Sequence, residues 1–260
     1  MGLHLIRVLR RNLIIITINN MVDLHTHILS NIDDGASSVE EAFLLAEELF
    51  NQGVRSVVCT PHFDPRKNSI MNFVEKRTEA ISKMDGSPVS LITGSETILN
   101  DYLFHYPELS QLCIYNTNYI LIELPYSKKW QENVFEMLEK LINYYGLTPI
   151  IAHIERYPAI NKKKKHMRRL VDLGCLLQLN ASSVINRKSW RKVSRYLMQG
   201  FIDVLASDCH NMNNRPPLLS DAYRKINLVL GNKYSKLLME NAERIISGIE
   251  LKKKQFYMIE

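Results

Sequence analysis

Val22-Asp23-Leu24-His25-Thr26-His27 is an apolar run that ends in two histidines, and five later segments of the chain repeat this arrangement. Each is an apolar run of the kind that forms a buried parallel strand, followed directly by side chains that can bind metal. Those side chains are His62, Glu96, Glu123, His153, and Asp208 with His210. In a barrel of parallel strands the residues that follow the strands meet at one rim, where barrel enzymes place their active sites. The six runs therefore predict a multinuclear metal site on an α/β barrel.

Helical patterns separate these runs. Ser37 or Ser38 can cap a helix that ends near Gln52, and Gly53 is typical of a helix stop. Further helices are expected at 69–84, 130–145, 162–173, 188–199, 218–230 and 233–247, with a seventh strand at 176–179 and an irregular segment at 98–118. Strand and helix alternate throughout, which predicts a distorted (β/α)7 TIM-like barrel, one strand short of the usual eight.

Length and composition favour a single domain. The 260 residues are 46% hydrophobic, which is enough for one large core and favours a single domain. The balance of 33 Lys+Arg against 27 Asp+Glu is only mildly basic, and a basic rim around a phosphate site explains it as well as nucleic acid or a membrane surface would. Basic residues are not interleaved with aromatic ones, so no nucleic-acid partner is expected. The four cysteines are scattered, which predicts a cytoplasmic protein without disulfides.

His25 and His27 stand two residues apart, so on a strand both imidazoles face the same side and can reach one ion. Imidazole and carboxylate donors without thiolate suit Mn, Fe or Zn. Such a histidine pair is common and weak evidence by itself. Glu96, Glu123 and Asp208 strengthen it, because three carboxylates in one cleft would each cost several kcal/mol to bury unpaired, and cations remove that cost.

Three sequence motifs resemble those of a known family. The stretch 22–29, followed by Asp33-Asp34-Gly35, resembles the first motif of the PHP (polymerase and histidinol phosphatase) superfamily. His153-Ile154-Glu155-Arg156-Tyr157 and the segment 206–217 resemble later motifs of one branch, the bacterial manganese-dependent protein-tyrosine phosphatases of capsule and exopolysaccharide operons. The resemblance covers roughly residues 21–248.

The resemblance implies three divalent metal ions, Mn²⁺ before Fe or Zn. The first ion would be held by His25, His27, Glu96 and Asp208. Glu96 would bridge to a second ion, held also by Glu123 and His153, and the third would be held by Asp34, His62 and His210. Asp33 competes with Asp34 for this last role, and the spacing from His27 favours Asp34.

The expected chemistry is hydrolysis of a phosphomonoester. A water that bridges two divalent ions loses its proton near neutral pH and becomes the nucleophile. Arg156 and Arg215 are the residues expected to neutralise the phosphoryl oxygens, since a planar guanidinium binds phosphate bidentately. Either Asp208 or a metal-bound water would protonate the leaving group, and the sequence does not choose between them.

The resemblance also implies a substrate, phosphotyrosine in the tail of a bacterial tyrosine autokinase that controls capsule or exopolysaccharide synthesis. Phe63, Tyr126 and Tyr157 are expected walls for its ring, and the basic stretch 156–165 is expected to attract the phosphorylated tail. One alternative is a small-molecule phosphatase, with histidinol phosphate as the obvious substrate. Another is a metal-stabilised scaffold that docks the kinase without turnover.

Cys209 and Arg215 match the C-x5-R spacing of cysteine-dependent tyrosine phosphatases. That chemistry requires a loop of backbone N–H groups around the phosphate, usually with glycine. Here the loop has no glycine, and Pro216-Pro217 removes two donors. Cys209 is therefore expected to take no part in catalysis.

Residues 1–20 differ from the rest of the chain. Three arginines precede the apolar stretch 13–18, which is too short for a signal sequence or a membrane span and has no cleavage site after it. We expect a disordered tail or an upstream start codon at 1–20 and no membrane insertion. Residues 21–250 are expected to form the PHP phosphatase domain, and 251–260 a C-terminal tail.

Overall fold

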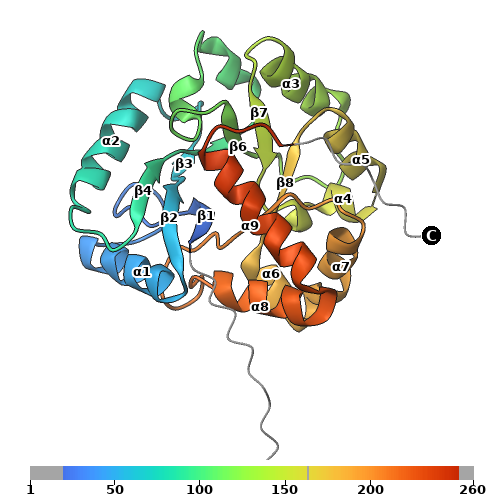
Figure 1. The fold of residues 1–260 in the computed structure, drawn as a ribbon. Coiled ribbons are helices and arrows are strands. Elements are labelled where there is room, and N and C mark those ends of the chain that lie inside the picture. The colour runs from blue at the N-terminus through green and yellow to red at the C-terminus, as the bar shows by residue number, and fades with distance from the viewer. Residues whose placement is uncertain (1–19, 163, 252–260) are drawn as a thin grey trace, which may run out of the picture.

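The computed structural model describes residues 20–162 and 164–251, in which strands and helices alternate along the chain (Figure 1). The strands are β1 (Met21–Thr26), β2 (Val54–Cys59), β3 (His62–Phe63), β4 (Ser90–Thr93), β5 (Glu96–Ile98), β6 (Tyr119–Glu123), β7 (Thr148–Ile151), β8 (Leu176–Asn180) and β9 (Val204–Ala206). The α-helices are α1 (Val39–Asn51), α2 (Ile70–Ser82), α3 (Glu132–Asn143), α4 (Pro158–Lys162), α5 (Lys164–Asp172), α6 (Ala181–Ile185), α7 (Arg187–Met198), α8 (Leu219–Leu230) and α9 (Asn232–Ile246). Apart from Asn20 and Leu251, the expected terminal tails lie outside the described residues.

All strand pairs are parallel, in one sheet ordered β1-β2-β4 and another ordered β3-β5-β6-β7-β8-β9. The two sheets share strand paths. The chain bends at Thr60-Pro61 between β2 and β3, and at Gly94-Ser95 between β4 and β5. Each of these pairs continues one path, so the strands of the described residues follow the seven paths that the sequence predicts.

β1 and β9 bring the two ends of the curled sheet together. Thr26 and Cys209 form an isolated parallel bridge, and the His27 N–H donates to the Cys209 carbonyl at 2.9 Å. The Asp208 N–H donates to the His25 carbonyl at the same distance. The first and last motifs of the sequence therefore lie side by side, as a distorted barrel requires.

Two groups of apolar side chains form the core. The larger one packs the helices onto the outside of the sheet, with Leu45 and Leu49 of α1 among its buried members. The smaller one joins side chains from several strands, Leu24, Val58, Leu121, Ile150 and Val204.

α9 crosses the end of the barrel at which the strands begin (Figure 1). Its Asn241 donates to the Asp203 carbonyl just before β9, and Tyr119 at the start of β6 donates to the Ile249 carbonyl just after α9. This leaves the opposite end, where the strands finish, free for the predicted site.

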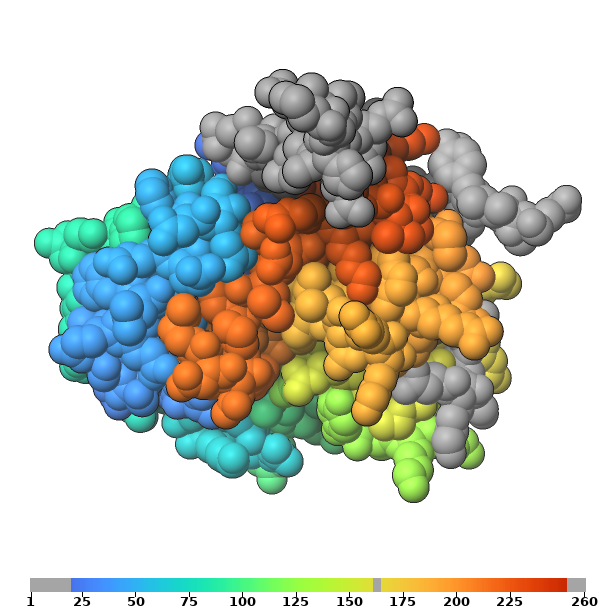
Figure 2. Space-filling view, turned by 90° about the horizontal axis from the view of Figure 1, so that it is seen from below, coloured from blue at the N-terminus to red at the C-terminus, as the bar shows by residue number. Residues whose placement is uncertain are grey.

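α1 begins where the sequence places a cap. The Ser38 hydroxyl accepts from the Glu41 N–H at 3.2 Å, so Ser38 is the N-cap, whereas Ser37 contacts the Glu41 carboxylate. α1 and α8, far apart in the sequence, lie side by side on one face (Figure 2), where Gln52 donates to the Pro217 carbonyl at 2.7 Å. None of the helices within the described ranges is long and apolar enough to cross a membrane.

Candidate metal centre

The structure brings together all nine side chains predicted as ligands, at the end of the barrel where the strand paths finish. They come from seven segments that are far apart in the sequence: His25 and His27, Asp34, His62, Glu96, Glu123, His153, and Asp208 with His210. Three overlapping groups of their donor atoms have the spacing of a metal site, and within each group these atoms lie within 4.8 Å of one another.

The first predicted set surrounds one point. His25 Nε2 and His27 Nε2 are 3.1 Å apart, so the two imidazoles do face the same side. Glu96 Oε2 lies 3.1 Å from the first nitrogen and 3.2 Å from the second. Asp208 Oδ1 lies 3.4 and 3.5 Å from the same two atoms. Two nitrogens and two carboxylate oxygens thus converge, as a divalent cation of borderline hardness requires.

The second set shares Glu96 with the first. Its other oxygen, Oε1, lies 2.8 Å from His153 Nε2, which is 3.7 Å from Glu123 Oε1. Glu96 therefore presents one oxygen to each set, the arrangement of a bridging carboxylate. His62 Nδ1 lies 3.1 Å from Glu96 Oε2, the oxygen that faces the first set, so the third set is in contact with Glu96 as well.

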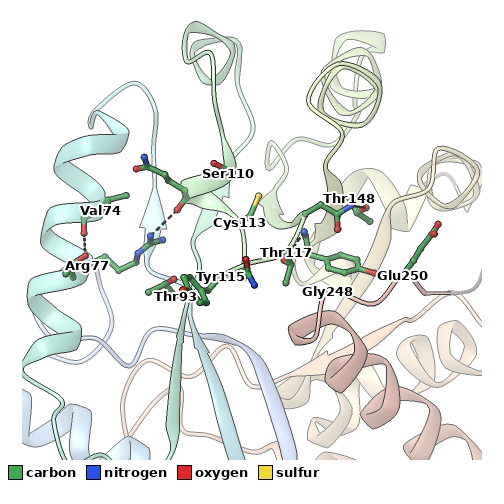
Figure 3. Close-up of a pocket in the computed structure, with 15 residues that line it drawn as sticks. Val74, Arg77, Thr93, Ser110, Cys113, Tyr115, Thr117, Thr148, Gly248 and Glu250 are labelled. Atoms are coloured by element: carbon green, nitrogen blue, oxygen red, sulfur yellow. Dashed lines mark hydrogen bonds between the residues drawn. The ribbon is translucent and has the colours of Figure 1, made fainter.

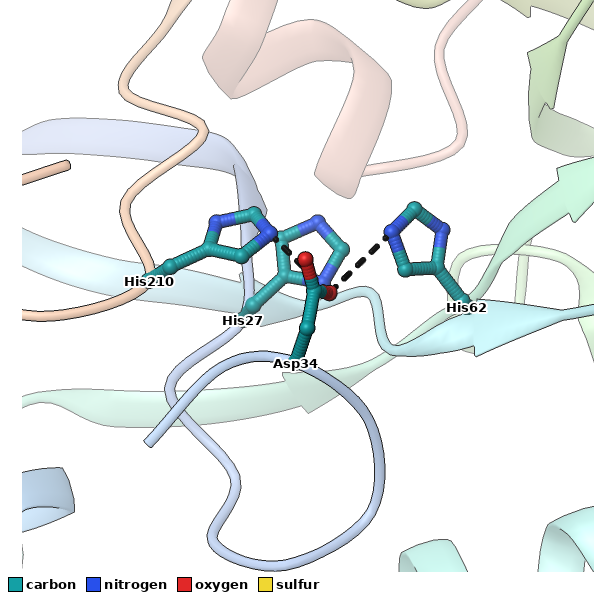
Figure 4. A group of neighbouring side chains, drawn as sticks. All are labelled: His27, Asp34, His62 and His210. Atoms are coloured by element: carbon teal, nitrogen blue, oxygen red, sulfur yellow. Dashed lines mark ion pairs between the residues drawn. The ribbon is translucent and has the colours of Figure 1, made fainter. Parts of the chain in front are cut away.

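The third set gathers around Asp34 (Figure 4). Asp34 Oδ1 lies 3.4 Å from His62 Nε2 and 3.4 Å from His210 Nε2, and His27 belongs to the same group. The Asp34 side chain is 63% exposed, so this set opens to solvent.

Two members of the cluster, Glu96 and His210, have the protonation that binding of a cation requires. Burial would raise the pKa of the Glu96 carboxyl, but the charge of His25 and hydrogen bonds from the imidazoles hold that pKa well below its usual value. Burial lowers the pKa of His210 to about 4, helped by the charges of His27 and Arg215. Its buried Nε2 has no hydrogen-bond partner, which leaves a lone pair available to a metal ion.

Asp33 and Asp34, the two candidates for the third ligand set, point to different partners. Asp33 Oδ2 lies 2.6 Å from His27 Nδ1 and accepts from the His62 backbone N–H at 2.9 Å. Against the effect of burial, the His27 contact lowers the pKa of Asp33 to about 2. Asp33 is thus the carboxylate that orients a ligand histidine through its outer nitrogen, while Asp34 faces the third set.

Two ligand positions have left-handed backbone. His153, between β7 and the short 3-10 helix Ile154–Arg156, has φ 32° and ψ 55°, and Asp208 has φ 53°. This conformation costs about 1–2 kcal/mol for a residue other than glycine. Such strain at buried ligands is typical of functional sites.

Both predicted arginines reach the cluster. Arg156 Nη1 donates to Asp208 Oδ2 at 3.0 Å, and Arg215 Nη2 lies 2.8 Å from both oxygens of the same carboxylate. Arg215 Nη1 is also 3.6 Å from Asp34 Oδ2. Two partly exposed guanidinium groups therefore flank the candidate ligands at the solvent side, an arrangement that can bind an anion.

Two of the three predicted ring walls are wrong. Phe63 and Tyr157 are fully buried, the first against Phe73 and the second with its hydroxyl accepting from the Leu124 N–H at 2.9 Å, so neither can stack on a substrate. Tyr126 is 59% exposed and its ring centroid lies 5.6 Å from that of Tyr157. It remains the one wall of the three that a substrate can touch.

Cys209 has surroundings that do not suit a nucleophile. Its side chain is fully buried, and burial raises the pKa of the thiol well above its usual value, followed in effect by the charge of Asp23. A nucleophilic cysteine needs the opposite shift.

Two buried amides of β8, Gln178 and Asn180, contact the candidate ligands, and the sequence analysis did not single out Gln178. Gln178 Oε1 accepts from the His153 N–H at 2.6 Å and lies 3.2 Å from His25 Nδ1, and Asn180 Nδ2 donates to Asp208 Oδ2 at 2.6 Å. The available signal was the amide inside the apolar strand Leu-Leu-Gln-Leu-Asn, since a buried polar side chain needs partners.

Comparison with known proteins gives the family. The model for capsular polysaccharide synthesis proteins CpsB/CapC matches residues 21–247. The chain belongs to the CpsB/CapC family. Among its relatives are the tyrosine-protein phosphatase CpsB of Streptococcus pneumoniae, 33% identical over 87% of this chain and 98% of that protein. The tyrosine-protein phosphatase CpsB of Streptococcus agalactiae is 31% identical, with 88% and 99% covered.

Solved structures agree with the CpsB/CapC assignment at the level of the fold. A chain from the crystal structures of YwqE from Bacillus subtilis and CpsB from Streptococcus pneumoniae, described as metal-dependent tyrosine phosphatases, has a TM-score of 0.81 at 23% identity, covering 92% of this chain and all of that one. A lactonase from Listeria monocytogenes has a TM-score of 0.56 at 10% identity, covering 91% and 95%. The predicted TIM-like PHP fold is confirmed.

A cavity of about 940 Å³ lies away from the ligand cluster, at the gap between β4 and β6 (Figure 3). Its lining includes Arg77 of α2, Thr93 and Tyr119, and none of the nine ligands. The buried Arg77 guanidinium donates to the carbonyl oxygens of Gly94 at 2.5 Å and Gln111 at 3.0 Å. These contacts stabilise the bend between β4 and β5, so the buried Arg77 guanidinium has a structural role.

Proposed function

We propose that this CpsB/CapC protein is a metal-dependent protein-tyrosine phosphatase. The observation that carries the proposal is the meeting of nine imidazole and carboxylate ligands with two guanidinium groups at one open rim. The relatives named tyrosine-protein phosphatase support the same activity. Cysteine chemistry is disfavoured by the buried Cys209 thiol.

The ligand sets fit three divalent ions, and we propose Mn²⁺, with Fe or Zn as alternatives. His25, His27, Glu96 and Asp208 would hold the first ion. Glu96, Glu123 and His153 would hold the second, and Asp34, His62 and His210 the third. When bound, such ions supply a water with a lowered pKa and neutralise charge on the phosphoryl group.

The remaining steps belong to side chains. Arg156 and Arg215 bind the phosphoryl oxygens and stabilise the charge that spreads over them in the transition state. Both oxygens of Asp208 are occupied, by Asn180 and by the two arginines. Asp208 is thus not free to carry a proton to the leaving group. Its Oδ1, which faces His25 and His27, would bind the first ion, and the carboxylate holds the two guanidinium groups in place. A phenol leaving group, with a pKa near 10, needs little help from an acid.

An open rim suits phosphotyrosine on a protein. Asp34 is mostly exposed, and His62 and Glu123 are partly exposed, so the phosphate can reach the ligands without a deep pocket. Tyr126 stands beside Arg156 at this rim, where an aromatic ring of the substrate can contact it. We propose as partner the tyrosine-rich tail of a bacterial tyrosine kinase that controls capsule or exopolysaccharide synthesis, encountered in the cytoplasm.

The test combines turnover and metal analysis. Purified full-length protein is assayed with a tyrosine-phosphorylated peptide and with histidinol phosphate, with Mn²⁺ present, before and after chelation and Mn²⁺ return. The expected result is a much higher kcat/KM for the peptide, its loss on chelation and its recovery with Mn²⁺. Preference for histidinol phosphate would establish the small-molecule alternative, and peptide binding without turnover would establish the docking scaffold.

A further inference from the structure

Gln178 and Asn180 form a hydrogen-bonded chain on β8, a strand that contributes none of the nine proposed ligands. Both side chains are buried, Gln178 completely. Gln178 Nε2 donates to Asn180 Oδ1 at 2.8 Å, so the two amides are linked to one another. Burial of an amide costs free energy unless the amide is hydrogen-bonded, so the partners at the two ends of this chain must account for its burial.

One end fixes the direction of the Gln178 amide. The backbone N–H of His153 can only donate, and its acceptor at 2.6 Å is the side-chain oxygen of Gln178. With the amide turned over, two N–H donors would face each other at this distance. The oxygen must therefore lie on the side of His153, and the NH₂ group must point toward Asn180.

This direction determines the protonation of His25. The Gln178 oxygen also lies 3.2 Å from His25 Nδ1, and an amide oxygen accepts only from a nitrogen that carries a proton. His25 Nδ1 is accordingly the protonated nitrogen. His25 Nε2, which faces Glu96 at 3.1 Å and His27 at 3.1 Å, is left to bind the metal ion.

The other end holds a carboxylate. Because Asn180 Oδ1 accepts from Gln178, its NH₂ group is the part that faces Asp208, and it donates to Oδ2 at 2.6 Å. Asp208 Oδ1 is then the oxygen that faces His25 Nε2, at 3.4 Å. A single orientation of both amides thus satisfies His153, His25 and Asp208 together.

We propose that Gln178 and Asn180 are positioning residues that set the tautomer of His25 and the orientation of Asp208 for metal binding. The inference rests on the proposed function, because it assumes that the first ligand set holds a metal ion. Hydrogen bonds behind ligands commonly contribute about 10–100-fold to metal affinity or activity. β8 contributes no proposed ligand, and this positioning role explains why it nevertheless carries two buried amides next to the ligands.

The test measures Mn²⁺ binding directly. Full-length protein freed of metal by chelation is titrated with Mn²⁺ in a calorimeter, as wild type, Gln178→Met, Gln178→Glu and Asn180→Leu. Gln178→Met removes both hydrogen-bonding functions at similar volume and is expected to weaken the tightest Mn²⁺ site about 10–100-fold. Gln178→Glu keeps an acceptor for His25 and is expected to lose less than about tenfold.

Asn180→Leu tests the chain from its other end. The expected loss is smaller, about tenfold, since Arg156 and Arg215 still hold Asp208. Asn241→Leu is the matched control, because this amide also joins two elements, bonding the Asp203 carbonyl at 2.8 Å, but at the opposite end of β9. It is expected to keep wild-type Mn²⁺ affinity.

The outcomes separate this inference from the proposed function. Wild-type protein that binds no Mn²⁺ would remove the proposed function itself. Wild type that binds Mn²⁺, together with a folded Gln178→Met variant of equal affinity, would overturn only the positioning role. Equal losses in the Met and Glu variants would also overturn it, because packing alone would then explain them. If Gln178→Met does not fold, Asn180→Leu decides, and unchanged affinity there refutes the inference.

Discussion

Gly35→Ala should inactivate the enzyme through a collision between backbone segments. A Cβ atom added at Gly35 would lie 2.0 Å from the carbonyl oxygen of His27 and 2.7 Å from its Cβ. Neither atom is the end of a flexible side chain, so the loop itself must move. To reach an ordinary contact distance of about 3.5 Å the two segments must separate by about 1.5 Å.

The separation breaks specific contacts. The Ala36 N–H donates to the His27 carbonyl at 3.1 Å, and the Gly35 N–H donates to Asp33 Oδ1 at 2.9 Å. Losing them displaces both Asp33, which contacts His27, and the neighbouring proposed ligand Asp34. We expect about 1–3 kcal/mol less stability from overpacking and about a 100-fold lower rate, as for misplacement of reacting groups by about 1 Å.

Initial rates on a phosphotyrosyl peptide at saturating Mn²⁺, bound Mn²⁺ and denaturant unfolding measure these effects. Gly86→Ala is the control, since Gly86 has φ 82° and no atom within 4 Å of its Cβ position. It should lose about 1–2 kcal/mol through left-handed backbone and keep its rate. A Gly35→Ala variant with wild-type rate and metal content would refute the reasoning.

Four further predictions follow from the site. Arg215→Lys replaces a guanidinium 2.8 Å from both Asp208 oxygens by a point charge and should lower kcat/KM about 100-fold with bound metal unchanged; equal kinetics would exclude a phosphate-binding role. Asp33→Asn should weaken Mn²⁺ binding about 10–100-fold through His27, and calorimetry that finds no change would contradict it. Cys209→Ser should keep most of its activity in steady-state assays, whereas an inactive but folded and metal-loaded variant would restore the cysteine mechanism. Chelation should lower the free energy of unfolding, by about 2.7 kcal/mol relative to protein at a free Mn²⁺ concentration of 100 times Kd, and identical melting curves would argue against a bound ion.

The common location of the candidate ligands could be predicted from the sequence, because the parallel strands of a barrel all end at the same rim. Every candidate ligand except Asp34 lies at the end of an apolar run, and parallel strands bring such positions to one rim. Asp34 is indicated by the family resemblance and not by the strand pattern. The assignment of His25 and Glu96 to one ion is what the family resemblance implies, and the strand pattern alone predicts only that they lie at the same rim. The seven strand paths could also be predicted, because the apolar runs alternate with helical patterns along the sequence.

Contacts that depend on the direction in which a side chain points could not be predicted from the strand pattern. Whether Phe63 and Tyr157 face the substrate or the core depends on bends such as the one at Thr60-Pro61, which apolar patterning does not encode. Gln178 is 153 positions from His25, and a single amide in a strand gives no indication of its partner. Asp33 and Asp34 are neighbours whose roles differ only because the loop turns between them.

The left-handed backbone at His153 and Asp208 has a consequence for protein engineering. Glycine at either position would relax the chain by about 1–2 kcal/mol and remove a ligand at the same time. In protein kept free of metal, variants chosen only for resistance to heat would therefore change toward glycine at these positions and become more stable but inactive. Directed evolution of this scaffold has to select for turnover and thermal tolerance together.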